Sequence, residues 1–258
     1  MSSRAGALHI VEYDALVFRR VWRGTIMTTF LNPLFFLAAM GWGLGAFVNR
    51  GAGGVGGVPY LEFLAPGLLA TSTMQTAAGE CMYPLLGKLM WDRTYEAILA
   101  TSMRIGEVIV GEVAWITLRL LMVSTIFFVV MIFFGVVHSP LTLLVIPAAV
   151  LTGLAFATPI MAFTATQRDE TGFPNIFRFG IMPLFLLGGA FFPISQLPLV
   201  LQAVAWATPL THGVALCRSL VVGNAVPGEV LLHVGVMAAY AIGGFFLARR
   251  LFVRRLAK

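Results

Sequence analysis

The sequence predicts an all-α integral membrane protein, and its composition is the first reason. Hydrophobic residues make up 59% of the 258 residues and charged residues 11%, whereas about 25% of the residues in soluble domains are charged. The mean hydropathy is +0.91. Five or six windows approach the ~20 apolar residues that a helix needs to cross a bilayer. We therefore expect six transmembrane helices, with both termini on the same side of the membrane.

The chain begins with a helix that we expect to lie in the membrane surface. Within residues 1–24, apolar side chains recur three and four positions apart and form one stripe, made of Leu8, Val11, Ala15, Phe18 and Trp22. Charged residues occupy the other faces, as in interfacial helices. The transmembrane domain follows over residues 25–258. Its six predicted helices are residues 25–48, 61–83, 108–137, 141–166, 177–192 and 230–247.

A polar stretch, residues 87–103, separates the second predicted transmembrane helix from the third. Its charged residues, with Arg104 just beyond, are Lys88, Asp92, Arg93 and Glu96. This charge density excludes burial in lipid, and the apolar residues between the charges recur at helical spacing. We expect an amphipathic helix on which a partner protein acts; a helix that merely lies on the membrane surface is the alternative.

A second interrupted region, residues 194–222, precedes the last predicted transmembrane helix. Pro198, Pro209 and Gly213 break its apolar sequence. Such a pattern favours a helical hairpin that enters the membrane only partway over a full crossing. We expect this re-entrant hairpin on the outer side.

The distribution of basic residues predicts the orientation. Fourteen Lys and Arg residues fall in the two termini and in the loops 84–106 and 167–178, whereas the opposite face has only Arg50 and Arg218. By the positive-inside rule both termini are cytoplasmic. Because the basic residues cluster at the ends of the predicted helices, they report topology and do not indicate a nucleic-acid surface.

Motifs for catalysis are missing from the sequence. A Walker A loop needs a Lys followed by Ser or Thr, but the two lysines are Lys88, which precedes Leu89, and Lys258, the last residue. The chain therefore cannot hydrolyse ATP by that route. The four histidines are scattered, without metal-site spacing, and no acid–base group indicates catalytic residues. We expect no metal and no cofactor on this chain.

Among the charged residues of the predicted transmembrane helices, we single out Glu80, Glu112 and Arg119. A lone charge at such a depth is costly and is usually paired. Arg119 could pair with Glu112 or with Glu80 and so fix the helix packing. Alternatively, the three residues line a polar path for a substrate.

Local motifs along most of the chain resemble the membrane subunit of type 2 ABC exporters. RTYEAILAT at 93–101, followed by Gly111 and Glu112, is similar to the family signature after the second transmembrane helix. YLEFLAPG at 60–67 resembles the start of that helix, and FFPISQLP at 191–198 with AWATPLTH at 205–212 resembles the external hairpin. The similarity is greatest to the nodulation-factor (lipooligosaccharide) and daunorubicin exporters.

The resemblance implies a separate ATPase subunit, which binds ATP and magnesium, and a second permease copy in a homodimer or heterodimer. It makes 87–103 the coupling helix, with ATPase contacts from Lys88, Asp92, Arg93, Tyr95, Glu96 and Arg104. Arg93 and Glu96 are the strongest candidates. The exit gate of the hairpin would comprise Phe191, Phe192, Pro193, Trp206 and His212. The implied location is the bacterial cytoplasmic membrane.

The resemblance further implies an amphipathic substrate, with a lipid-linked saccharide or polysaccharide first and a hydrophobic drug second. Two classes of protein remain as alternatives. An ATP-independent carrier would show repeated broken helices around a midplane ion site, and we find one markedly broken segment. An intramembrane lipid-modifying enzyme would need His or acidic residues that converge near one membrane face.

Overall fold

The computed structural model describes residues 3–101 and 103–256, and these residues form helices without a named strand. The predicted all-α class is therefore confirmed. The α-helices are α1 (Ser3–Ala38), α2 (Gly45–Ala52), α3 (Tyr60–Cys81), α4 (Tyr83–Leu86), α5 (Thr94–Leu99), α6 (Ile105–Phe133), α7 (Val145–Thr166), α8 (Gly172–Ile176), α9 (Met182–Leu187), α10 (Leu199–Trp206), α11 (Pro209–Val222) and α12 (Pro227–Leu256). Short π-helical and 3-10 segments connect several of them, namely η1 (Ala39–Leu44), η2 (Gly87–Trp91), η3 (Pro140–Leu144), η4 (Phe177–Ile181) and η5 (Ile194–Gln196).

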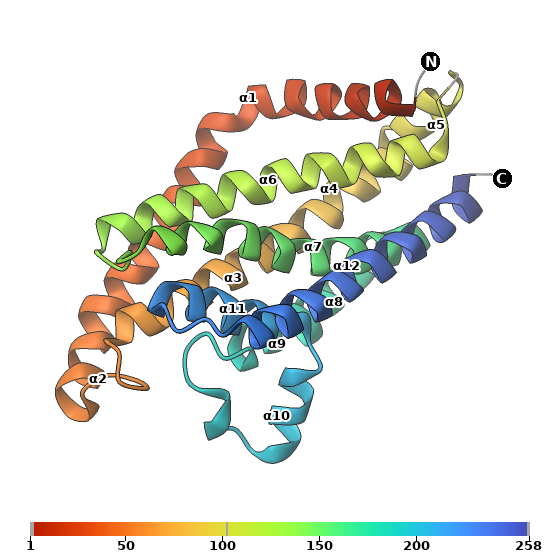
Figure 1. Cartoon of the computed structure of the whole chain (residues 1–258). Coiled ribbons are helices and arrows are strands. Elements are labelled where there is room, and N and C mark those ends of the chain that lie inside the picture. Colours follow the sequence, from red (N-terminus) through yellow and green to blue (C-terminus); the bar gives the residue numbers. More distant parts are fainter. Residues whose placement is uncertain (1–2, 102, 257–258) are drawn as a thin grey trace.

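The first helix is longer than predicted, because α1 joins the interfacial segment to the first transmembrane segment without a break. Its first part lies along α6, and the remainder descends toward α2 (Figure 1). Gly6, Ile10 and Asp14 form the buried face of the first part, while Leu8 and Trp22 of the predicted apolar stripe are 60% and 42% exposed. The stripe is thus divided, because Leu8 and Trp22 are exposed whereas Val11 and Phe18 are half-buried. Its location in the membrane surface stays a prediction.

Helices α3 and α7 form the centre of the bundle. Leu64, Leu69 and Met74 of α3 are fully buried, and α7 packs along both α3 and α12. The crossing of α7 and α12 is close: a Cβ on Gly244 would lie 2.5 Å from the Thr158 hydroxyl oxygen. That hydroxyl donates a hydrogen bond to the Ala241 carbonyl at 2.8 Å. A small residue at 244 lets the two backbones approach, as in other membrane helix pairs.

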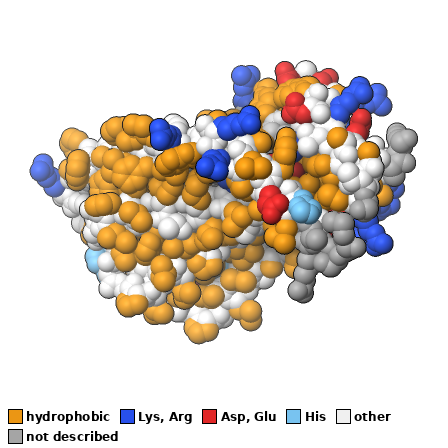
Figure 2. Space-filling view, turned by 90° about the horizontal axis from the view of Figure 1, so that it is seen from above, with side chains coloured by type: hydrophobic (Ala, Val, Ile, Leu, Met, Phe, Trp, Pro, Cys, Tyr) orange, Lys and Arg blue, Asp and Glu red, His pale blue; other side chains and the backbone are white. Residues whose placement is uncertain are grey.

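The two ends of the chain lie at the same end of the bundle, beside α5 (Figure 1). There Arg255 of α12 donates hydrogen bonds to the carbonyl oxygens of Thr164 and Ala165 at the C-terminus of α7, where helix carbonyls have no intrahelical partner. The surface seen from above is broadly hydrophobic, with most charged side chains toward one end (Figure 2). A long apolar surface with charge at its end is what a membrane-embedded bundle needs.

The number of long apolar helices differs from the predicted six. Four described helices are long and apolar enough to cross a membrane, spanning Gly6–Gly51, Ile105–Phe133, Pro140–Thr166 and Pro227–Leu256. The pair α10 and α11, bent by 83°, could count as a fifth. The six-helix arrangement is thus reproduced only in part, and the bend between α10 and α11 falls within the predicted hairpin.

Two predicted transmembrane helices account for the difference. Residues 61–83 correspond to α3, which carries Glu62 and Glu80 but is mostly buried among other helices, so it need not be strongly apolar itself. Residues 177–192 correspond to a shorter apolar helix, Gly172–Leu187. It ends there because the next residues include Gly189, whose φ of +81° is left-handed.

Two neighbouring glycines of α12 allow a matched test of the close crossing. We expect Gly244→Val to destabilise the protein by about 1–3 kcal/mol, because the new side chain overlaps Thr158 and Pro159 of α7. Gly243→Val is the control, since a Cβ at 243 meets no atom within 4 Å. Thermal unfolding in detergent measures both variants, and equal losses would contradict the crossing.

Candidate functional site

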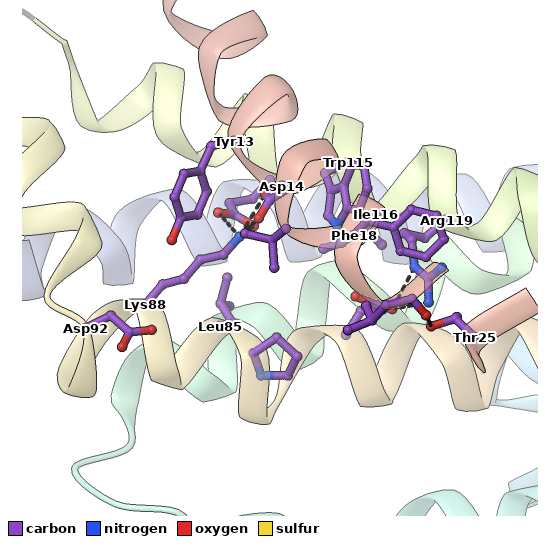
Figure 3. Close-up of a pocket in the computed structure, with 15 residues that line it drawn as sticks. Tyr13, Asp14, Phe18, Thr25, Leu85, Lys88, Asp92, Trp115, Ile116 and Arg119 are labelled. Carbon is purple, nitrogen blue, oxygen red and sulfur yellow. Dashed lines mark hydrogen bonds and ion pairs between the residues drawn. The ribbon is translucent and has the colours of Figure 1, made fainter. Parts of the chain in front are cut away.

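A buried ion cluster joins three segments of the chain near the charged end of the bundle. The Lys88 ammonium, on η2, lies 2.6 Å from an Asp14 carboxylate oxygen on α1 and 2.7 Å from a Glu112 oxygen on α6. It also donates to the second oxygen of Glu112 at 2.9 Å. Figure 3 shows the Lys88 side chain extending to Asp14. The three side chains are 13%, 6% and 4% exposed, respectively.

The cluster holds two carboxyl groups against one ammonium, and burial and these charges shift the pKa values of its members. Burial raises the pKa of Asp14, and the positive charge of Lys88 opposes that rise only in part. Burial alone would lower the pKa of Lys88, but the charges of Glu112 and Asp14 outweigh it and the pKa is raised. Lys88 is therefore firmly protonated, and the site is built to hold a positive charge between two helices.

A second ion pair joins α6 to α3. Arg119 donates to a Glu80 carboxylate oxygen at 2.8 Å, so one of the two predicted pairings of Arg119 is present. The other is not, because Glu112 binds Lys88 instead. The guanidinium of Arg119 also lies 4.6 Å from the ring centre of Phe18 on α1, and Phe18 meets Trp115 edge-on. This cation–π contact ties α1 to α6 a second time.

A cleft of about 400 Å³ lies among the two ion pairs. Its walls come from α1, from the end of α3 with α4 and η2, and from α6, as Figure 3 shows. Aromatic rings and charged groups alternate along it, and the residues involved include Tyr13, Phe18, Glu80, Asp92, Trp115 and Arg119. Glu80, Glu112 and Arg119 are each paired, and all three line the cleft. Their predicted role in a polar path for a substrate stays a prediction.

The polar stretch 87–103 is not the single helix predicted from its sequence. The π-helix η2 ends at Trp91, and α5 starts at Thr94. Between them Arg93 has a φ of +48°, the one left-handed non-glycine residue in the described part of the chain. Such a residue turns the backbone sharply, so the amphipathic pattern is divided between two short helical segments.

The break separates an inner from an outer face. Asp92, Arg93 and Glu96 are exposed, and so is Arg104 after the stretch. Tyr95 is buried, packs against the Phe252 ring of α12, and has a hydroxyl without a hydrogen-bond partner in the described residues. Burial and the nearby Glu112 charge raise the pKa of Tyr95 well above its ordinary value. Of the six predicted contacts with a partner, four are thus accessible, while Lys88 and Tyr95 anchor the segment.

The residues of the predicted exit gate fall into two groups with different neighbours. His212 Nδ1 lies 2.8 Å from Nδ1 of His233, and His212 Nε2 lies 3.0 Å from the Trp206 carbonyl oxygen. Phe191 instead packs against Phe36 of α1. Phe192 and Pro193 are half-buried in the loop before η5. The site reasoning from sequence missed His233 as a partner of His212, and it missed Asp14 as a partner of Lys88.

The fold and the site define the protein class as a multi-pass membrane protein whose polar end is tied together by buried ion pairs. Comparison with protein families identifies the particular family. Residues 8–222 match the ABC-2 type transporter family, and the chain belongs to that family. It is therefore a transport permease and not an enzyme, and the family implies an ATPase partner.

Individual relatives agree with the family match. The chain is 36% identical to Nodulation protein J of Rhizobium leguminosarum bv. trifolii, over 92% of this chain and 90% of that protein. It is 35% identical to Nodulation protein J of Rhizobium meliloti (strain 1021), over 93% of this chain and 90% of that protein. The inner membrane transport permease YadH of Escherichia coli (strain K12) is 24% identical over 92% and 90%.

The Lys88 cluster predicts a pH-dependent stability that a single substitution should expose. Lys88→Met removes the ammonium that holds down the pKa of Asp14, so this pKa rises further above that of the unfolded chain. The folded state then binds more protons than the unfolded state, and the free energy of unfolding falls with rising pH by up to about 1.4 kcal/mol per pH unit for each such carboxyl.

Thermal unfolding in detergent between about pH 5 and pH 8 tests this dependence. We expect Lys88→Met to lose stability toward pH 8 more steeply than the native chain, because ionising a carboxyl in the cluster no longer gains an attraction. Lys88→Arg, which keeps the positive charge, is the control. A Lys88→Met profile parallel to that of the native chain would show that the carboxyl groups are ionised without help from Lys88.

Proposed function

We propose that this permease is the membrane subunit of an ATP-driven exporter, and that a separate ATPase acts on the segment 87–103. One observation carries the proposal: Lys88 of that segment is bonded at once to α1 and to α6. A force applied to the exposed side of the segment would reach both helices through this cluster. ATP binding and hydrolysis on the partner would then reposition α1 against α6 and open the path for the substrate.

The accessible residues of the segment are suited to hold the ATPase. Arg93 and Glu96 are exposed and opposite in sign, and neither forms a salt bridge within the described chain. The left-handed turn at Arg93 sets this residue at the start of α5. Charged pairs of this kind favour orientation and speed of docking more than raw affinity.

We further propose that the termini and the segment 87–103 are cytoplasmic and that the protein resides in the bacterial cytoplasmic membrane. The distribution of basic residues supports this orientation, as does the position of both termini beside α5 (Figure 1). The bent pair α10 and α11 would then face outward and gate the exit, with Trp206 and His212 at the gate.

The substrate that we favour is an amphipathic lipooligosaccharide, and the relatives called Nodulation protein J support this class by name alone. A second permease copy would complete the transport path. A hydrophobic drug is the other candidate substrate, which a transport assay with both compounds distinguishes.

Exchanging the two exposed charges of the coupling segment tests the ATPase contact. We expect Arg93→Glu with Glu96→Arg to weaken co-purification of the ATPase and to lower ATP-driven export at least tenfold, because each charge then faces a group of its own sign. Pull-down of the tagged permease and uptake of labelled lipooligosaccharide into inside-out vesicles measure the two effects.

The matched control is Arg168→Glu with Glu170→Arg, an exchange of exposed charges in the loop that follows α7. Export and ATPase recovery that stay unchanged in the Arg93 and Glu96 double variant would remove these residues from the contact. Export without any ATPase or ATP would favour an independent carrier over the proposed function.

A second prediction separates transmission of motion from docking. Asp14→Leu detaches α1 from the cluster but leaves Lys88 paired with Glu112 at 2.7 Å. We expect the ATPase to bind as before, while the amount exported per ATP hydrolysed falls several-fold because α1 no longer follows the segment. Parallel assays of ATPase activity and export in reconstituted vesicles give this ratio.

Glu12→Leu is the control for this experiment, since Glu12 is an exposed carboxylate on the same helix whose only described partner is His9. It should leave the export ratio at the native value. A native ratio in Asp14→Leu as well would mean that the Lys88 cluster supports the fold and takes no part in coupling.

A further inference from the structure

A groove of about 360 Å³ lies between α6 and α12 at the end of the bundle that carries the termini. It is separate from the cleft beside Lys88, and its lining shares no residue with that cleft. The lining consists of Arg104, Gly106, Glu107 and Val110 from the start of α6, with Phe245 and Arg249 from α12. One arginine therefore comes from each side of the groove.

The two guanidinium groups have no acidic partner of their own. Neither Arg104 nor Arg249 forms a salt bridge within residues 3–101 and 103–256. Glu107, the acidic residue of the lining, accepts a hydrogen bond from the backbone N–H of Arg104 at 3.0 Å through one of its two carboxylate oxygens. The lining therefore holds two guanidinium groups against one carboxylate, and its net charge is positive.

The polar and apolar parts of the groove are arranged along the helix axes. Arg104 directly precedes α6, and Val110 lies about one and a half turns further along. On the opposite wall, Arg249 is about one turn from Phe245. Each wall thus passes from a guanidinium at the membrane surface to an apolar side chain at greater depth, as the headgroup and chains of a lipid do.

The groove has enough volume for a lipid headgroup. A Cβ at Gly106 would meet no atom within 4 Å, so that the groove is open at the level of the two arginines. Liquid water occupies about 30 Å³ per molecule, and about 360 Å³ is therefore enough for a glycerophosphate group and more than a single ion needs.

We propose that this groove binds an anionic phospholipid of the cytoplasmic leaflet, with its phosphate between Arg104 and Arg249 and its acyl chains against Val110 and Phe245. The leaflet follows from the orientation in the proposed function; the binding chemistry does not depend on it. Basic pockets between transmembrane helices on this side of a membrane recognise anionic headgroups. The lipid would hold the first turn of α6, which directly follows the coupling segment.

The test is lipid binding to the purified full-length permease, without ATPase or ATP. Native mass spectrometry in a neutral detergent follows titration with phosphatidylglycerol and, separately, with phosphatidylcholine of the same acyl chains. We expect the native chain to prefer phosphatidylglycerol, and Arg104→Gln with Arg249→Gln to weaken that binding about tenfold or more. Gly106→Leu, which leaves the charge unchanged, should weaken it as well by filling the open space.

The matched control is Arg250→Gln with Arg254→Gln, which removes the same amount of charge at two positions of α12 that do not line the groove. It should retain native binding. Equal loss in this control, or equal binding of the two lipids by the native chain, would overturn the site in favour of diffuse attraction. If labelled lipooligosaccharide competed for the same site, the proposal that a phospholipid resides there would be wrong. Because no transport is measured, failure here leaves the proposed export function standing, and failure of export leaves the lipid site standing.

Discussion

The Lys88 ammonium constrains the structure because it is buried and cannot remain without compensating charge. Its partners come from residues 14 and 112, so three distant segments must meet at one point. Removing one partner of a buried pair costs several kcal/mol, whereas the intact pair adds little net stability. The cluster is therefore better understood as a device that fixes relative positions than as a source of stability. Gly111 permits this meeting, since a Cβ there would lie 2.6 Å from Ile10 on α1.

The segment 87–103, which is the coupling segment of the proposed function, has buried side chains that attach it to the bundle and exposed side chains that are available to a partner. Its buried side chains attach it to the rest of the bundle, Lys88 through the ion cluster and Tyr95 through Phe252 of α12. Its exposed charges face away from the bundle. The left-handed turn at Arg93 lies between η2, which carries Lys88, and α5, which carries Tyr95. Local backbone strain of this kind persists where the surrounding structure holds it in place.

Much of the fold could be predicted from the sequence because long apolar helices leave an unambiguous pattern. The predicted 108–137 and 141–166 helices differ by a few residues from the structure, and Arg119 does pair with Glu80. Pairings across the bundle were harder. Asp14 lies next to the apolar stripe of its helix, between Val11 and Phe18, which was the available signal for a buried carboxylate; its partner, Lys88, is far away in the sequence. The positive φ of Arg93 has no sequence signal at all, since Gly or Asn is the usual residue at such a turn.

The two attachments of the coupling segment differ in what could loosen them. The Lys88 cluster at its start is internal and nearly excluded from water, so salt and lipid composition have little access to it. The segment 87–103 is followed by the start of α6, which borders the groove between Arg104 and Arg249. The partner that we propose for this groove is a lipid. An anionic lipid in the groove would be attracted by about 1 kcal/mol per arginine. The strength of this contact would therefore depend on how much anionic lipid the leaflet contains. The Lys88 attachment would then depend little on the charge of the membrane, whereas the position of residues 103–106 would respond to it.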